Sequence, residues 1–278
     1  MQKLIWIFVA AVLGPTAAGA AEGKGTPPSA LDARIARIAD HSACARIYWP
    51  GRGYAPKAYL GGMALTYAKA VCAADAGGDS AAQVMNQPFG PVGEDALSSN
   101  FWGESGNSRL GHIRTAFAVA IGLGMRQSGG NATVGRDRAK SKPTAETAEA
   151  GLFQTNYESL DGNPWLPKLV DEYAANPSLC QSAVFMKGLR DLRQKVVGSG
   201  PGADYQKRIK ACPALAAESA VVILRTAKSQ FGPIEQHQVE LRPECDDMLR
   251  QVEKVLPCEV GRAPLEVPLP PEIAHRYD

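Results

Sequence analysis

One segment of the chain is apolar almost all the way round a helix, so the rest of the fold has to cover it. In residues 109–127, "RLGHIRTAFAVAIGLGMRQ", apolar side chains recur at helical spacing, and residues 116–123 leave hardly any polar face. A helix of this kind must be surrounded by other parts of the protein. The segment therefore predicts a central buried helix that ends at Gln127, followed by a polar loop up to Thr147.

The remainder of the chain also favours helices. Ser29 is a suitable N-cap for a helix over residues 30–40, and no segment of any length alternates between polar and apolar residues as a strand would. Hydrophobic residues make up 45% of the chain and charged residues 21%, which is the balance of an ordinary globular protein. We expect a mainly α fold, with one helical domain over residues 29–258. Further helices are predicted at residues 57–78, 164–175, 177–189, 202–211, 212–230 and 244–256.

Both ends of the chain are predicted to lie outside this domain. Lys3 precedes an apolar run and then small residues up to Ala20, which is the pattern of a secretory signal peptide over residues 1–20. The apolar run is too short to span a bilayer, so no stable membrane insertion is expected after cleavage. Residues 21–28 are predicted to be a linker, and the Pro-rich residues 259–278 an extended tail. The predicted location is the periplasm or the outside of the cell.

The cysteines fit this location, and the overall charge excludes one class of partner. An even count of 6 Cys in an exported chain predicts up to three disulfides, whose pairing the sequence leaves open. No two of them have CxxC spacing and the 4 His are scattered, so no metal site, His-based triad or cofactor is predicted. A net charge of +2 without a long basic run argues against nucleic acid as a partner.

Two neighbouring stretches have the features of a site that cleaves glycosidic bonds. Residues 124–137, "GMRQSGGNATVGRD", begin at the end of the buried helix, and residues 150–159, "AGLFQTNYES", follow shortly after. Cleavage requires a proton for the leaving oxygen and stabilisation of a cationic transition state, and carboxyl groups usually provide both. The end of a buried helix suits such an acid because apolar packing raises its pKa. The glycines beside it let the backbone approach a ligand closely.

These stretches resemble the active-site motifs of the lysozyme-like superfamily, which contains goose-type lysozymes and lytic transglycosylases. In that superfamily a helix ends in Glu-Ser, a loop follows, and then comes a Gly-Leu-x-Gln strip, which matches "GLFQ" at residues 151–154. The chain is most similar to a group of secreted, mostly uncharacterised microbial proteins, through residues 96–255. The motifs that carry this likeness are "IGLGMR", "GRD", "TAEAGLFQT" and "FGPI…VELR". The resemblance implies a lysozyme-like helical fold and a polysaccharide substrate.

Gln127 departs from this pattern, because it occupies the position where the superfamily has its glutamic acid. Glutamine keeps the shape and hydrogen-bonding reach of glutamate but does not donate a proton usefully near neutral pH. Loss of the general acid should lower the rate by roughly two to four orders of magnitude. Three interpretations follow: the site binds saccharide without cleaving it, another carboxylate carries the chemistry, or the helix end never held the acid.

The candidate replacement acids lie in the loop and just before the strip. Asp137 has the position of the second carboxylate in the goose-type enzymes, and Glu149 lies just before the strip, with Glu146 three residues earlier. The structural alternatives are a loop ion pair with Arg136 or Arg138 for Asp137, a charge at a helix N-terminus for Glu149, and a solvated surface position for Glu146.

Several other side chains are predicted to contact the sugar. Gln127 and Gln154 can hydrogen-bond it, and aromatic residues can stack on its faces unless they pack in the core. Arg126 can bind a carboxylate of the substrate or cap the C-terminus of the helix. The aromatic candidates are Tyr157, Trp165 and Trp102.

The sequence as a whole supports three hypotheses of function. The first is an exported lysozyme-like glycoside hydrolase or lytic transglycosylase acting on peptidoglycan or a related polysaccharide. The second is a catalytically inactive saccharide-binding protein of the same fold. The third is a disulfide-stabilised helical protein that only binds a partner or supports a structure.

Overall fold

The protein is mainly helical and is stabilised by three disulfides. The computed structural model describes residues 29–75, 109–135, 142–161, 163–188, 196–226, 239 and 241–258. The predicted signal peptide, linker and C-terminal tail lie outside these residues. No helix in the described part of the chain is both long and apolar enough to cross a membrane.

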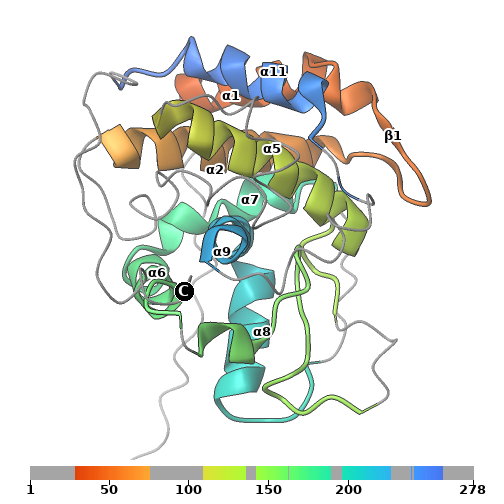
Figure 1. Ribbon diagram of the computed structural model, residues 1–278, viewed down its shortest axis with the longest axis vertical. Coiled ribbons are helices and arrows are strands. Elements are labelled where there is room, and N and C mark those ends of the chain that lie inside the picture. Colours follow the sequence, from red (N-terminus) through yellow and green to blue (C-terminus); the bar gives the residue numbers. More distant parts are fainter. Residues whose placement is uncertain are drawn as a thin grey trace, which may run out of the picture.

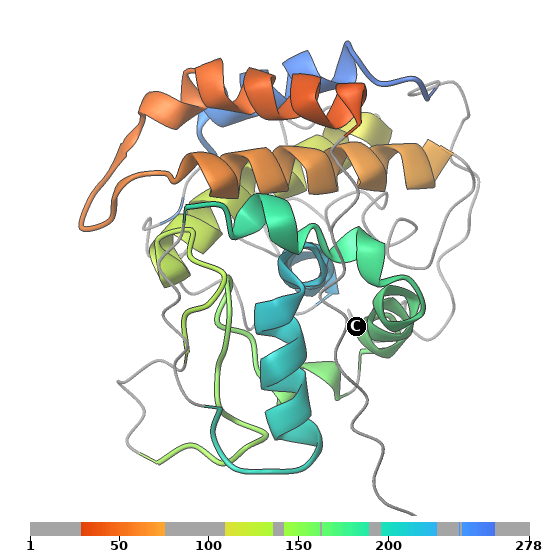
Figure 2. The same cartoon turned by 180° about the vertical axis from the view of Figure 1, so that it is seen from behind.

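Four helices form one half of the molecule. They are α1 (Ala30–His41), α2 (Lys57–Asp75), α5 (Arg109–Ser128) and α11 (Pro243–Glu253). Figures 1 and 2 show α1 and α11 as an outer layer over α2 and α5. Ser29 caps α1, accepting from Asp32 N–H while the Asp32 carboxylate accepts from Ser29 N–H, as its N-cap assignment predicted.

The other half is built around α9 (Pro213–Thr226). This helix contacts α2 and α5 above it and three shorter helices, α6 (Leu166–Ala175), α7 (Ser182–Phe185) and α8 (Pro201–Ala211). Residues 214–224 of α9 are buried all round. The prediction that α5 is a buried helix is confirmed, because Ile113 to Met125 have almost no exposed surface. It shares the centre of the molecule with α9.

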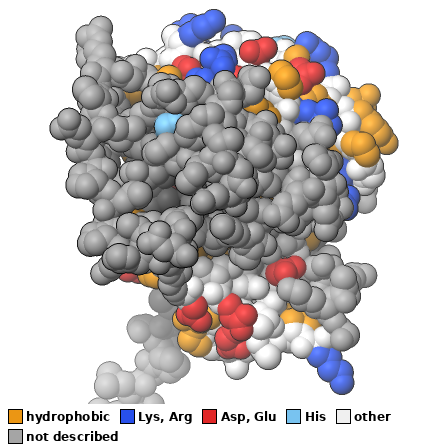
Figure 3. Space-filling model, in the orientation of Figure 1, with side chains coloured by type: hydrophobic (Ala, Val, Ile, Leu, Met, Phe, Trp, Pro, Cys, Tyr) orange, Lys and Arg blue, Asp and Glu red, His pale blue; other side chains and the backbone are white. Residues whose placement is uncertain are grey.

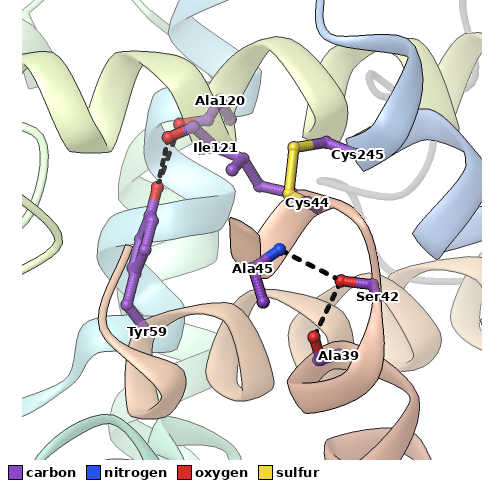
Figure 4. Close-up of a disulfide and its surroundings, with 8 residues drawn as sticks. All are labelled: Ala39, Ser42, Cys44, Ala45, Tyr59, Ala120, Ile121 and Cys245. Atoms are coloured by element: carbon purple, nitrogen blue, oxygen red, sulfur yellow. Dashed lines mark hydrogen bonds between the residues drawn. A yellow bond between two sulfur atoms is a disulfide. The ribbon is translucent and has the colours of Figure 1, made fainter. Parts of the chain in front are cut away.

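A tyrosine and a disulfide fasten the first half together (Figure 4). The hydroxyl of Tyr59 in α2 donates to the backbone oxygens of Ile121 at 2.8 Å and Ala120 at 3.3 Å in α5. Cys44 in the short 3₁₀ helix η1 (Cys44–Arg46) is bonded to Cys245 in α11. Cys72 pairs with Cys258, so the C-terminal part of the domain is linked twice to its N-terminal part.

A buried ion network adds to this connection between α5, α11 and α2. Arg114 donates from Nε to Asp246 at 2.8 Å and from Nη1 to Glu253 at 2.9 Å, and its side chain is 7% exposed. The Tyr67 hydroxyl also donates to Glu253, at 2.5 Å. Burial, and then the neighbouring Glu253 carboxylate, raise the pKa of Tyr67 well above its ordinary value. Removing one member of such a network leaves a buried charge without its partner, so these residues serve the fold.

Two predictions about local structure need correction. Residues 177–189 do not form one helix: a 3₁₀ helix, η3 (Pro177–Cys180), is separated from α7 by Gln181, whose φ is 52°. The break follows from two ties to the end of α8, since Cys180 is bonded to Cys212 and Ser182 donates to the Ala211 oxygen at 2.6 Å. The sequence predicted no strand, but residues 48–56 contain a hairpin of two strands, β1 (Tyr48–Trp49) and β2 (Gly53–Tyr54), which are too short to show alternation.

Candidate functional site

The end of α5 is shaped by the glycines that follow it. Gly129 has a φ of 65°, and its N–H donates to the Met125 oxygen at 3.0 Å, which is a left-handed ending that glycine favours. Ser128 donates from its hydroxyl to the Gly124 oxygen at 3.0 Å and is buried. Gln127 is half-buried and Arg126 is exposed at this end of the helix. The sequence therefore predicted correctly that Gln127 lies at the end of a buried helix.

A residue that sequence analysis did not single out reaches the same helix end. Arg52, in the turn of the β1–β2 hairpin, donates from Nη2 to the backbone oxygen of Arg126 at 2.5 Å. A Cβ built on Gly129 would lie 3.9 Å from Cδ of Arg52, so the two segments are in contact. In the sequence Arg52 stands between two glycines, which indicates an exposed turn. The sequence does not indicate that this arginine contacts the end of α5.

The loop after α5 and the Gly-Leu-Phe-Gln strip are joined by a hydrogen bond. The N–H of Gly151 donates to the Val134 oxygen at 2.8 Å, and Ala150 N–H donates to the Thr155 oxygen at 2.9 Å. Phe153 is fully buried beside Gly124, where an added Cβ would stand 3.2 Å from its ring. The two stretches that the sequence analysis paired are thus neighbours in space.

Helix α8 positions the strip from the other side. A Cβ on Gly151, whose φ is 73°, would stand 2.6 Å from Ile209 Cγ2, so only glycine fits here. Tyr205 donates to Thr155 Oγ1 at 3.0 Å, and burial raises the pKa of Tyr205 to about 12. Gln206 Nε2 donates to the Ala145 oxygen at 2.9 Å. These contacts hold residues 145–155 along α8.

The two predicted carboxylates in the described part of this loop are both partly accessible. Glu146 and Glu149 are half-buried, and Glu149 lies between the buried Ala148 and Ala150. The backbone oxygen of Glu146 accepts from Tyr157 N–H at 3.0 Å, which folds the loop back on itself. Asp137, the third predicted acid, lies outside the described residues.

The predicted sugar contacts have different surroundings. Gln154 is 7% exposed and has a φ of 52°. Its Nε2 donates to the Gly151 oxygen at 2.9 Å, so the side-chain amide stabilises the turn of residues 151–154. Tyr157 is half-buried, and its ring lies edge-on to Tyr205, with 6.1 Å between ring centroids. Trp165 is 8% exposed and packs in the core, so the prediction that it stacks on a sugar is wrong. Trp102 lies outside the described residues.

The described residues include no group of three His, Cys, Asp or Glu side chains arranged to hold a metal ion. The described residues of this region offer two half-buried carboxyl groups and a half-buried amide at a helix end. No protein-family model matches the chain, and comparisons with curated proteins and solved structures find no match either.

Proposed function

We propose that the protein is an exported, lysozyme-like glycoside hydrolase or lytic transglycosylase that acts on peptidoglycan or a related polysaccharide. The observation that carries the proposal is the hydrogen bond from Gly151 N–H to the Val134 oxygen. It joins the stretch after the buried helix to the Gly-Leu-Phe-Gln strip, the two parts that the lysozyme-like resemblance requires to meet.

The three disulfides support the export that this function needs. Disulfides persist in proteins outside the reducing cytosol, and the described cysteines are all paired. Export through a signal peptide at residues 1–20, to the periplasm or beyond the cell, is part of the proposal.

Within the proposed site, Glu149 is the acid that protonates the leaving oxygen, with Glu146 or Asp137 as the second carboxylate. Glu149 is favoured because it lies two residues before Gly151, the residue tied to the loop after α5, and because it is half-buried between the buried Ala148 and Ala150. Gln127 and Arg126 at the helix end hydrogen-bond the sugar, and Tyr157 and Gln154 border it from the strip.

A second candidate function is saccharide binding without cleavage. The observation in its favour is Gln127 itself, a half-buried amide at the helix end, where the resemblance implies an acid. An amide there can hold a sugar hydroxyl as donor and acceptor but cannot supply the proton.

The test is a screen of the mature protein on peptidoglycan, chitosan and soluble glucans, with the masses of the products measured. A gain of one water per cut marks hydrolysis, and anhydro ends mark transglycosylation. Co-sedimentation with insoluble peptidoglycan, without any product, would support the binding function. If the protein neither cleaves nor binds any of these polymers, both proposals are wrong and the third hypothesis, a helical partner-binding protein, is favoured.

A further inference from the structure

The β1–β2 hairpin exposes two aromatic rings next to each other. Tyr48 and Tyr54 are 62% and 63% exposed and are the exposed large hydrophobic side chains of the described residues. They are paired across the two strands, with ring centroids 5.6 Å apart and an edge-to-face arrangement. Since burying a tyrosine ring is favourable, two exposed rings side by side form a surface suited to a ligand.

The hairpin is firmly attached to the helices, so this surface has a fixed position. Trp49, whose side chain alternates to the other face of β1, is 6% exposed. A Cβ on Gly122 of α5 would stand 3.3 Å from its ring, and the Arg242 guanidinium lies 5.8 Å from the ring centroid. Trp49 thus anchors the hairpin to α5 while the two tyrosines face outward.

The chain segment that carries the tyrosines is basic. Residues 43–57 contain Arg46, Arg52 and Lys57 but no acidic residue. Lys57 pairs with Asp40 at 2.9 Å, whereas Arg52 is exposed and uses one of its N–H donors on the Arg126 oxygen. Figure 3 shows hydrophobic side chains and Lys or Arg side chains together on the right-hand edge, where Figure 1 draws the hairpin. A ligand with negative charge fits this surface.

We propose that Tyr48, Tyr54 and Arg52 form a saccharide subsite for a carboxylate-bearing sugar chain, beside the Gln127 end of α5. This inference rests on the proposed function and specifies the class of substrate. The tyrosine rings stack against the apolar face of a sugar ring, and the Arg52 guanidinium binds the carboxylate through its planar N–H donors. The contact between Arg52 and the Arg126 oxygen places this subsite next to the helix end that the proposed function uses.

Two other roles for the same residues predict different results. A purely structural cross-strand pair would stabilise the hairpin without affecting any ligand. A contact with an anionic membrane surface would use the same tyrosines and arginine, but would bind phosphatidylglycerol vesicles instead of a sugar chain.

The experiment measures binding by calorimetry to two probes: the disaccharide–tetrapeptide of peptidoglycan, which carries carboxylates, and the neutral chitotetraose. The variants are Tyr48→Ala with Tyr54→Ala, the matched pair Tyr48→Phe with Tyr54→Phe, and Arg52→Gln. Arg37→Gln, an exposed arginine of α1, is the charge control. Thermal unfolding of every variant checks that the fold is kept, and the phenylalanine pair retains the ring faces if the alanine pair does not fold.

The expected result is that the alanine pair weakens binding of both probes roughly two- to tenfold per ring, while the phenylalanine pair binds almost as well as the native protein. Arg52→Gln should weaken only the acidic probe, by up to about fivefold and less at high salt, and Arg37→Gln should change neither. If the native protein binds a probe but the alanine pair and Arg52→Gln bind it unchanged, the subsite is overturned while the proposed function stands. Tyrosine-dependent binding to phosphatidylglycerol vesicles alone would also overturn it. If no saccharide binds at all, the proposed function itself has failed.

Discussion

The hydroxyl of Tyr59 occupies the space that a side chain at Gly124 would need: a Cβ built on Gly124 would overlap the Tyr59 oxygen. This hydroxyl donates to the Ile121 oxygen at 2.8 Å, so its position is fixed by the hydrogen bond as well as by burial. Gly124, the second glycine of the "IGLGMR" motif, therefore allows α2 and α5 to pack closely, just before the helix end that carries Gln127.

Gly124→Ala should lower the free energy of unfolding by about 2 kcal/mol, since the added methyl displaces the Tyr59 ring and its hydrogen bond. The control is Gly61→Ala in α2, where an added Cβ meets nothing closer than 3.8 Å. That variant should gain roughly 0.5–1 kcal/mol from its higher helix propensity. Urea unfolding of both variants measures the difference. If Gly124→Ala has the same free energy of unfolding as the native protein, α2 and α5 can separate at Gly124 without an energetic cost.

Removal of disulfides should destabilise the protein according to the length of chain that each one closes. Replacing both long-range pairs by Ser, Cys44 with Cys245 and Cys72 with Cys258, opens separations of 201 and 186 residues and should cost more than about 5 kcal/mol, whereas replacing Cys180 and Cys212 opens 32 residues and should cost about 4 kcal/mol. Thermal unfolding of the variants measures which loss is larger. In the native protein, mass spectrometry should find the 6 Cys oxidised, with the loss of a hydrogen from each. Free thiols in protein purified without reductant would contradict the pairing.

Stability should fall in alkaline solution because of Tyr205. Burial raises its pKa to about 12 from 10.0, so the unfolded chain releases the phenolic proton first. The stabilisation is complete below pH 10.0 and is lost as the pH rises through 12, by up to about 3 kcal/mol. Tyr205→Phe should show a smaller fall between these two pH values in urea unfolding. Tyr48→Phe, at an exposed tyrosine, is the control and should follow the native protein.

The opposite substitutions Gln127→Glu and Glu149→Gln should separate a working site from an inactive one. We expect Glu149→Gln to reduce cleavage of peptidoglycan by roughly two to four orders of magnitude, because it removes the proposed general acid. Glu158→Gln is the matched control, an exposed glutamate of the 3₁₀ helix η2 (Tyr157–Leu160) that follows the strip, and should leave the rate unchanged. Product release from peptidoglycan measures all three variants.

If the native protein only binds saccharide, the outcome is reversed. Gln127→Glu should then create cleavage, because it restores a carboxylic acid at the end of the buried helix, and Glu149→Gln should change nothing. If neither substitution alters cleavage or binding, the end of α5 is not part of a saccharide site.

Sequence reasoning located most of the helices, because each depends on a local pattern. The helical spacing of apolar residues correctly predicted where α5 lies and that it is buried, and Ser29 correctly predicted the start of α1. Capping residues and glycines close by in the sequence marked the start of α1 and the end of α5. The break at Gln181 was missed because it depends on distant partners, the disulfide from Cys180 and the hydrogen bond from Ser182.

The motifs in the sequence predicted that the two stretches of the candidate site, residues 124–137 and 150–159, belong together. How they contact each other is known only from the tertiary structure. The sequence by itself determined a mainly helical chain with six cysteines, an amide at the end of a buried helix and the Gly-Leu-Phe-Gln strip nearby. Only the folded chain decided which cysteines pair, that Gly151 bonds to Val134, and that Arg52 reaches the Arg126 oxygen. The physical reason is that these contacts join segments far apart in the sequence, whose approach is fixed by the packing of α2, α5, α8 and α9 and by no local preference.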